Sequence, residues 1–398
     1  MTQVAQAPSF LRARFGGLPG AFWALWAGTL INRMGTMATP FMTLYLVSVR
    51  RLSIPEAGGV MAASGAGALL SQLLGGVLAD RIGRRKTMLA ATLSTSIILV
   101  ALAHTRPIPV IVVLVGLLGI TIESYRPAAQ AMVADLVPEA DRTRAYGLLF
   151  WAVNLGFATA MTTGGLLAKT SFTALFWTDA LTGALFGLLV WRLIPGSQPQ
   201  PRGTDTPGGF RRVIHDRKML AFTLCVLAYA FVYFQCDSTL PLAMRAHGLS
   251  PSFYGMCMAL NGILICVLQP LIGPWLQKRD PGRIWAAGAA LLGIGFGLTA
   301  AAHTTAAYLA TVAIWTVGET ITAAVSGAIV AHLAPEHLRG RYAGLYGLAW
   351  SSGWLISSLL GTQLLSINPS ALWITCTVLC SAAALALTAL LPSRSDSS

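Results

Sequence analysis

The sequence predicts an all-α integral membrane protein with twelve transmembrane helices in two pseudo-symmetric bundles of six. Three observations carry this prediction. The 398 residues are 55% hydrophobic and only 10% charged, whereas a soluble domain carries about 25% charged residues. Apolar runs of about 20 residues, long enough to cross the hydrocarbon layer as a helix, recur along the whole chain. The second half of the chain also repeats the register of the first.

Each apolar run is expected to form one membrane span, including the runs that contain glycine or proline, which membrane helices tolerate. The spans are expected at 20–49, 56–80, 87–104, 108–134, 144–168, 172–194, 218–246, 251–277, 284–302, 305–332, 341–365 and 370–391. The first 19 residues are polar and show no cleavable leader pattern, so the first span is expected to act as the insertion signal.

The net charge of +13 is explained by the membrane topology. If the loops are assigned alternately to two sides, 20 of the 27 Lys and Arg residues fall on the side that carries both termini. The positive-inside rule then predicts cytoplasmic termini in a bacterial-type inner membrane. This placement explains the net positive charge, so no nucleic acid partner is expected. The protein is expected to lie in the lipid bilayer.

The repeat has an offset of 197 residues and needs no gap. It aligns Gly76 with Gly273, and it aligns the Pro-Glu-x-x-Arg-x-Arg-x-x-Gly-Leu segment at 138–148 with 335–345. A Pro-, Gly- and Arg-rich stretch separates the two copies. The predicted organisation is a first bundle at 1–194, a cytoplasmic linker at 195–217 and a second bundle at 218–398.

A short charged loop between the second and third spans carries the most specific motif. Its pattern, Gly-x-Leu-Ala-Asp-Arg-x-Gly-Arg-Arg, is formed by Gly76, Leu78, Ala79, Asp80, Arg81, Gly83, Arg84 and Arg85. Together with twelve spans, a six-plus-six repeat and a polar central loop, it resembles the major facilitator superfamily of transporters. The resemblance implies a major facilitator fold and halves that rock around a central site. No nucleophile–base pair or phosphate-binding loop appears in the sequence, so no enzymatic activity is expected, and the protein is expected to be a monomer. The resemblance implies no cofactor, with a proton gradient as the energy source.

The resemblance also implies a gating role for this loop. Asp80 would contact the start of span 11 in one state and release it in the other, favoured by the helix dipole. A simple topology anchor is the alternative. Span 5 carries a partial antiporter pattern, Gly156, Gly164 and Gly165, with Met161 where the pattern has proline. Gly76, Asp80, Arg81, Gly83, Arg84, Arg85, Gly156, Gly164 and Gly165 are therefore the candidates for conformational gating.

Ionisable residues inside spans are costly in hydrocarbon and are the default functional candidates. They are Arg33, Glu123, Arg126, Asp179, Asp237 and Glu319. Glu123 and Arg126 share a helix face, so a local structural bridge is one interpretation. The resemblance implies that spans 1, 4, 7 and 10 line the cavity, where Arg33, Glu123, Arg126 and Glu319 would meet.

Glu123 and Glu319, with Asp237 as an outer gate or proton entry, are the candidates for proton coupling. Asp237 could equally cap a helix end, and Asp179 is expected to be structural. The predicted substrate cavity consists of Arg33, Tyr125, Arg126, Asn154, Tyr229, Tyr233, Phe234, Asn261, Trp350 and Trp354. The six cysteines form no CxxC pair and no cluster with histidine, so no metal site is expected.

The leading functional hypothesis is a secondary transporter that exports small drug-like or metabolite compounds by proton-coupled alternating access, in the manner of a multidrug efflux antiporter. Proton-coupled uptake of a hydrophilic or anionic metabolite is one alternative, because two buried arginines would suit an anion. A non-transporting receptor or lipid-handling protein is another. The chain has no Gly-x-x-x-x-Gly-Lys motif, so ATP is not indicated as the energy source.

Overall fold

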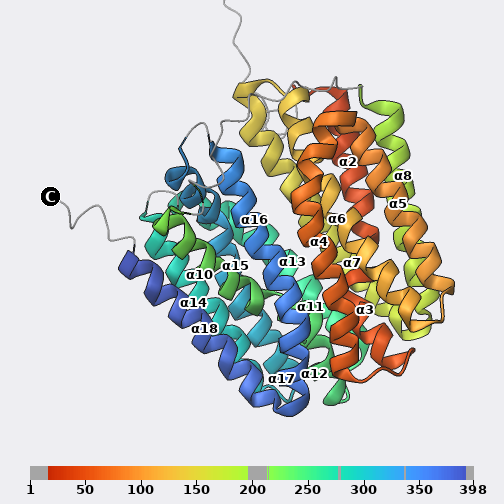
Figure 1. Cartoon of the computed structure of the whole chain (residues 1–398), viewed down its shortest axis with the longest axis vertical. Coiled ribbons are helices and arrows are strands. Elements are labelled where there is room, and N and C mark those ends of the chain that lie inside the picture. The colour runs from red at the N-terminus through yellow and green to blue at the C-terminus, as the bar shows by residue number, and fades with distance from the viewer. Residues whose placement is uncertain (1–16, 196–212, 214, 277–278, 336–337, 391–398) are drawn as a thin grey trace, which may run out of the picture.

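The computed structural model describes residues 17–195, 213, 215–276, 279–335 and 338–390, apart from the side chains of 73–82, 123, 125–128, 131, 140, 143, 274 and 390. The described residues form helices joined by short connections and contain no strand. The all-α prediction is therefore confirmed. Figure 1 shows two groups of helices, one from each half of the chain, lying side by side.

The first half supplies seven α-helices and one short 3₁₀ turn. They are α2 (Gly20–Gly35), α3 (Ala38–Ser48), α4 (Ile54–Ile82), α5 (Arg84–His104), α6 (Ile108–Leu136), η1 (Glu139–Asp141), α7 (Arg142–Thr170) and α8 (Phe172–Leu193). The second half supplies α10 (Arg217–Tyr233), α11 (Gln235–Ser238), α12 (Leu240–Ala246), α13 (Pro251–Leu276), α14 (Pro281–Gly297), η2 (Leu298–Ala301), α15 (Thr305–Leu333), α16 (Arg339–Ile356), a π-helical turn η4 (Ser357–Gly361), α17 (Thr362–Ile367) and α18 (Pro369–Leu390).

Eight helices in the described part of the chain are long and apolar enough to cross a membrane. The count of twelve spans and the exact domain boundaries stay predictions, since most of the expected linker lies outside the described residues. Four predicted spans are interrupted: the first between α2 and α3, the seventh at α11, the ninth where α14 passes into η2, and the eleventh at η4. The first two breaks, after Gly35 and after Tyr233, lie at nearly the same place in the two repeats.

Several helices begin with a side-chain cap, among them α8 at Ser171 and α15 at Thr304. Asp216 begins α10, where its Oδ1 accepts hydrogen bonds from the backbone N–H groups of Lys218 (3.0 Å) and Met219 (3.1 Å). Its Oδ2 accepts a hydrogen bond from the Tyr342 hydroxyl at 2.7 Å, which ties α10 to α16. Burial raises the pKa of Asp216, but these hydrogen bonds and the charge of Lys218 outweigh it and hold the pKa below its ordinary value.

The two halves meet through two equivalent pairs of helices. On one side α4 packs on α16, η4 and α17, and on the other α13 packs on α7. A Cβ at Gly58 would lie 2.4 Å from the carbonyl oxygen of Ser358, and a Cβ at Gly255 would lie 2.2 Å from that of Met161. Both members of the first pair lie 197 residues from those of the second.

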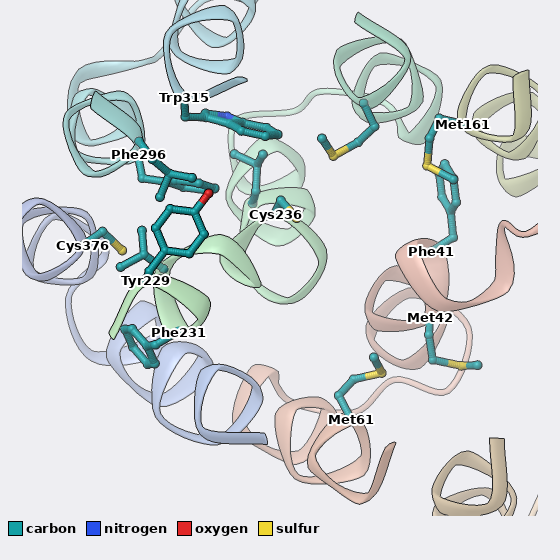
Figure 2. Packing of buried hydrophobic residues seen from close by; sticks show 14 of the residues in the cluster. Phe41, Met42, Met61, Met161, Tyr229, Phe231, Cys236, Phe296, Trp315 and Cys376 are labelled. Carbon is teal, nitrogen blue, oxygen red and sulfur yellow. The ribbon is translucent and has the colours of Figure 1, made fainter. Parts of the chain in front are cut away.

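A second rung repeats this relation. A Cβ at Gly65 would lie 2.6 Å from Cα of Leu355, and a Cβ at Gly262 would lie 3.2 Å from Cβ of Ala158. We call Gly58, Gly65, Gly255 and Gly262 the glycine ladder. At Gly58, Gly65 and Gly255 the opposing backbone leaves no room for a Cβ, so glycine is required there, whereas at Gly262 a Cβ would make a tight contact. Buried apolar residues continue across this contact, from Phe41, Met61 and Met161 to Cys236 and Tyr229 (Figure 2).

The contact between the halves is concentrated away from the end where α2 begins. Short helices α3, α11, α12 and α17 gather at the opposite end (Figure 1). Toward the end where α2 begins, a Cβ at Gly147 or at its repeat partner Gly344 would meet nothing within 4 Å. The close backbone contacts between the halves lie toward the end with the short helices, and Figure 1 shows the two groups of helices farther apart at the other end, which we call the parted end.

Candidate functional site

A cavity of about 260 Å³ lies among α10, α14, α15 and α16 of the second half. Five of the eleven described residues that line it are aromatic: Tyr229, Tyr233, Trp285, Tyr346 and Trp350. Among these eleven described residues, Glu319 is the one that carries a charge. The structure therefore presents one half-buried carboxylate inside an aromatic enclosure.

The Glu319 carboxylate is held by a neighbouring helix. Asn261 on α13 is 5% exposed, and its Nδ2 donates one hydrogen bond to Glu319 Oε2 at 2.7 Å and another to Thr316 Oγ1 at 3.0 Å. The Thr316 hydroxyl donates in turn to the Val312 carbonyl at 2.6 Å, so its oxygen is available as an acceptor. Both amide hydrogens of Asn261 are used, and this arrangement fixes the orientation of the amide.

A second set of hydrogen bonds positions the aromatic wall. The Thr322 hydroxyl donates to the backbone carbonyl of Glu319 at 2.9 Å. Since this uses the hydroxyl hydrogen of Thr322, the Tyr229 hydroxyl is the donor in the 2.7 Å contact between Tyr229 and Thr322. Tyr229 is thereby anchored one turn from the carboxylate.

The aromatic rings continue from this anchor toward the break in the seventh span. The ring of Tyr229 stacks on Tyr233 with centroids 6.4 Å apart, and Trp350 contacts both edge-to-face, at 5.8 and 5.3 Å. Phe234 follows, with Trp350 at 5.9 Å and Trp354 stacked at 5.5 Å. Aromatic faces carry negative potential, so this wall beside a carboxylate suits an organic cation.

Asp237 lies on α11, where the seventh span is broken. Its backbone carbonyl accepts a hydrogen bond from Thr43 of the first half at 3.0 Å, so it sits at the closed contact between the halves. Its carboxylate interacts electrostatically with Glu319. The structure thus places a second carboxylate between Glu319 and the closed end.

Arg33 does not line the Glu319 cavity, contrary to expectation. It lines a separate space of about 30 Å³ inside the first half, together with Asp179, Thr92 and Thr95. Asp179 also caps the chain after the break at Gly35: its Oδ2 accepts hydrogen bonds from the backbone N–H groups of Met37 (3.1 Å) and Ala38 (2.9 Å) at the start of α3. Asp179 therefore has the structural role that was expected, and Arg33 is its electrostatic neighbour.

The three glycines predicted for span 5 make two kinds of contact: two face a helix of their own half, and one faces the other half. A Cβ at Gly156 would lie 2.5 Å from Cβ of Arg33, and one at Gly164 would lie 2.9 Å from Cβ of Met37, so both close α7 onto the broken first span. Gly165 faces the other half, where Ser252 Oγ donates to its carbonyl oxygen at 2.9 Å. Asn154 lines neither cavity described above, and its Nδ2 donates to the Phe150 carbonyl of its own helix.

The charged loop is described only in part. Gly76, Asp80 and Arg81 belong to α4, and their side chains lie outside the described residues. Gly83 has φ 85° and makes the turn into α5, a conformation that favours glycine. Arg84 pairs with Asp135 on α6, and Arg85 lies over the Trp191 ring of α8 at 4.2 Å. In this structure both arginines brace helices of their own half.

The side chains of Glu123, Tyr125 and Arg126 on α6 also lie outside the described residues. Sequence reasoning missed Trp285, Tyr346, Thr322 and Ser326, which line the cavity, and Thr316, which bonds Asn261. Three of these five follow from one rule, because 316, 322 and 326 lie at helical spacing from 319 and share its face. Among the described residues no group of His, Cys, Asp and Glu is placed to hold a metal ion.

The chain is similar over most of its length to bacterial transporters. It is 26% identical to the uncharacterized MFS-type transporter YqjV of Bacillus subtilis, with 82% of each chain covered. It is 23% identical to a Na(+), Li(+), K(+)/H(+) antiporter of Planococcus maritimus, covering 83% of this chain and 85% of that one. It is 24% identical to the multidrug resistance protein MdtH of Proteus mirabilis, covering 81% and 82%.

Solved structures support the fold. A POT family transporter in complex with a thioalcohol conjugated peptide superposes with a TM-score of 0.82 at 14% identity, covering 95% of this chain and 97% of the other. The nucleoside transporter NupG gives 0.78 at 12%, covering 94% and 100%. The model of the Major Facilitator Superfamily matches residues 25–357 and 237–398. The chain belongs to this superfamily and is a multi-pass membrane transporter, not an enzyme.

Proposed function

We propose that this transporter exports small organic cations in exchange for protons, with Glu319 binding either the proton or the substrate. The observation that carries the proposal is the single carboxylate inside the aromatic cavity. An ionised carboxylate attracts a cation, and stacked rings stabilise it further by cation–π contact. A proton that neutralises the carboxylate removes the larger part of this attraction, so the two ligands compete.

The direction of transport and the orientation in the membrane belong to the same proposal. With cytoplasmic termini, the parted end of the molecule faces the cytoplasm, and the cavity would load substrate from there. Asp237 is proposed as the port through which protons reach Glu319 from the other side. The names of two relatives, a multidrug resistance protein and a monovalent cation/proton antiporter, support export by exchange.

The gating role of the charged loop also remains a proposal. Gly83, Arg84 and Arg85 hold α5 against α6 and α8 in this state. Uptake of an anion is not favoured, because the described Arg33 lies outside the Glu319 cavity. We infer that the rocking of two halves about the glycine ladder produces alternating access.

The test uses Glu319→Gln in whole cells that express the transporter. Wild-type cells are expected to accumulate several-fold less ethidium than cells without it, and an uncoupler should abolish the difference. Glu319→Gln should behave like the empty cells, because the neutral amide can neither bind a cation strongly nor carry a proton. Glu139→Gln, at an exposed carboxylate in η1, is the matched control and should export normally.

Charge selectivity is checked in the same cells with two compounds of one shape. Tetraphenylphosphonium should be exported and tetraphenylborate should not. Export by Glu319→Gln at the wild-type rate and with the wild-type pH dependence would refute the proposal. Higher accumulation in wild-type cells would instead indicate uptake.

A further inference from the structure

The geometry points to Asn261 as a positioning residue that transmits the charge state of Glu319 to the contact between the two halves. This inference rests on the proposed function and assigns the element that couples the site to the movement. It concerns a hydrogen bond between α13 and α15 and the packing of α13 on α7.

The first step is the bond itself. The 2.7 Å contact from Asn261 Nδ2 to Glu319 Oε2 is a charge-assisted hydrogen bond when the carboxylate is ionised. Such a bond is roughly twice as strong as one between neutral groups. A proton on Glu319, or a bound cation that draws on the same oxygens, weakens the bond. The second amide hydrogen remains on Thr316 at 3.0 Å, so α13 is loosened rather than released.

The second step is the position of Asn261 in the chain. It is followed directly by Gly262, a rung of the glycine ladder. A Cβ at Gly262 would lie 3.1 Å from the carbonyl oxygen of Asn154 on α7. Toward the closed end, Gly255 lies against Met161, and Ser252 bonds the carbonyl of Gly165. One face of α13 thus bonds the Glu319 carboxylate, while the adjacent face packs on α7 of the opposite half.

The third step concerns the other titratable groups near Glu319 and whether one of them could report its charge state to α13. The titratable groups that face Glu319 from the described helices are Tyr229 and Tyr233 on α10, Cys236 and Asp237 on α11, and Tyr346 on α16. None of these lies on α13. Asn261 is therefore the polar contact through which α13 senses the carboxylate in the described part of the chain. A separate contact links α11 to α13, where the Tyr254 hydroxyl donates to the Cys236 carbonyl at 3.1 Å beside Asp237, but it does not involve the Glu319 carboxylate.

The charge state of Glu319 therefore shifts the equilibrium between two states, one with the α13–α7 contact closed and one with it open. With Glu319 ionised, α13 is tied to α15, and the halves hold the contact seen here. With Glu319 neutralised or occupied, that tie weakens, and the α13–α7 contact opens more readily. A ligand shifts such an equilibrium only through its different affinity for the two states, and the Asn261 bond supplies this difference.

The experiment measures hydrogen–deuterium exchange of the purified full chain between pH 5.5 and 8.5, corrected for intrinsic exchange rates. In wild type, peptides from α7 and α13 should exchange several-fold faster at low pH. Asn261→Ala should exchange at the fast level throughout. Asn261→Gln, which keeps an amide donor, should recover part of the pH dependence. Gln363→Ala, which removes an exposed amide on α17, should match wild type.

Transport of tetraphenylphosphonium against pH is measured on the same variants and on Glu319→Gln. Loss of the pH dependence in both Glu319→Gln and Asn261→Ala supports the inference. If Glu319→Gln loses it while Asn261→Ala keeps wild-type transport and exchange profiles, Asn261 has no coupling role and the proposed function stands. If Glu319→Gln itself keeps the wild-type pH dependence, the proposed function fails, and the inference fails with it.

Discussion

Glu319 is the residue on which the proposed function depends. The sequence alone identifies it as a candidate, because placing an ionisable carboxylate in the hydrocarbon layer costs free energy and such residues usually serve a function. Its partners were visible only in part. Asn261 was expected in the cavity wall, but its bond to Glu319 joins two helices whose relative rotation the sequence does not encode. Trp285 was missed because α14 was not expected to face the cavity.

Trp350 should account for much of the affinity for cations at pH 8. Its ring contacts Tyr229, Tyr233 and Phe234. Cation–π contact in a desolvated site contributes about 1–2 kcal/mol, so Trp350→Ala should weaken tetraphenylphosphonium binding by roughly 5- to 30-fold. Titration calorimetry checks this. Trp350→Phe should lose less of this affinity. Trp151→Ala, at an exposed tryptophan on α7, should bind tetraphenylphosphonium with the wild-type affinity. Unchanged affinity in Trp350→Ala would show that the cation binds elsewhere.

At the scale of the element, the broken first span departs most from the sequence expectation of one continuous helix at 20–49. The backbone N–H groups at the start of α3 need acceptors because no preceding turn supplies them. The acceptor is Asp179, over 140 residues away on α8. Local sequence patterns cannot reveal a cap that arrives from another helix. Arg33, on α2 just before the break, lines the small cavity together with Asp179.

Removing this cap should destabilise the first half. Asp179→Ala leaves two buried N–H groups without an acceptor and removes the charge beside Arg33, so a loss of about 2–4 kcal/mol is expected. Thermal unfolding in detergent should show a clearly lowered midpoint. Asp179→Asn keeps an accepting oxygen and should fall between Asp179→Ala and wild type. Glu139→Ala serves as the surface control. Equal midpoints for Asp179→Ala and wild type would rule out the capping role.

At the scale of the whole molecule, the repeat was predictable and the conformation was not. The 197-residue register is written in the sequence, and both pairs of contacting helices follow it at Gly58, Gly65, Gly255 and Gly262. Which end of the molecule is closed depends on the balance between two packings of the same residues. No periodicity or motif reports that balance. The side chains of Glu123, Arg126 and Asp80 lie outside the described residues, so their predicted roles stay predictions.

The glycine ladder should determine how often the present conformation is occupied. In Gly255→Ala the new Cβ would clash with the Met161 carbonyl, so the halves should separate at the closed end. Gly327 lines the cavity, and a Cβ there would meet nothing within 4 Å, so Gly327→Cys can report access. Labelling of that position from the parted end should slow several-fold in Gly255→Ala. Gly344→Ala, with open space around it, should label at the parental rate. Equal rates in the two variants would contradict the ladder's role.

Every described residue that lines the cavity belongs to one half, while the glycine ladder is shared equally by both. Under the proposed function, substitutions in the cavity wall on α10, α14 and α15, away from Glu319, would alter which compound is recognised and leave the ladder residues untouched. A lineage of such transporters could then diversify its substrates within one half while the contact between the halves is kept.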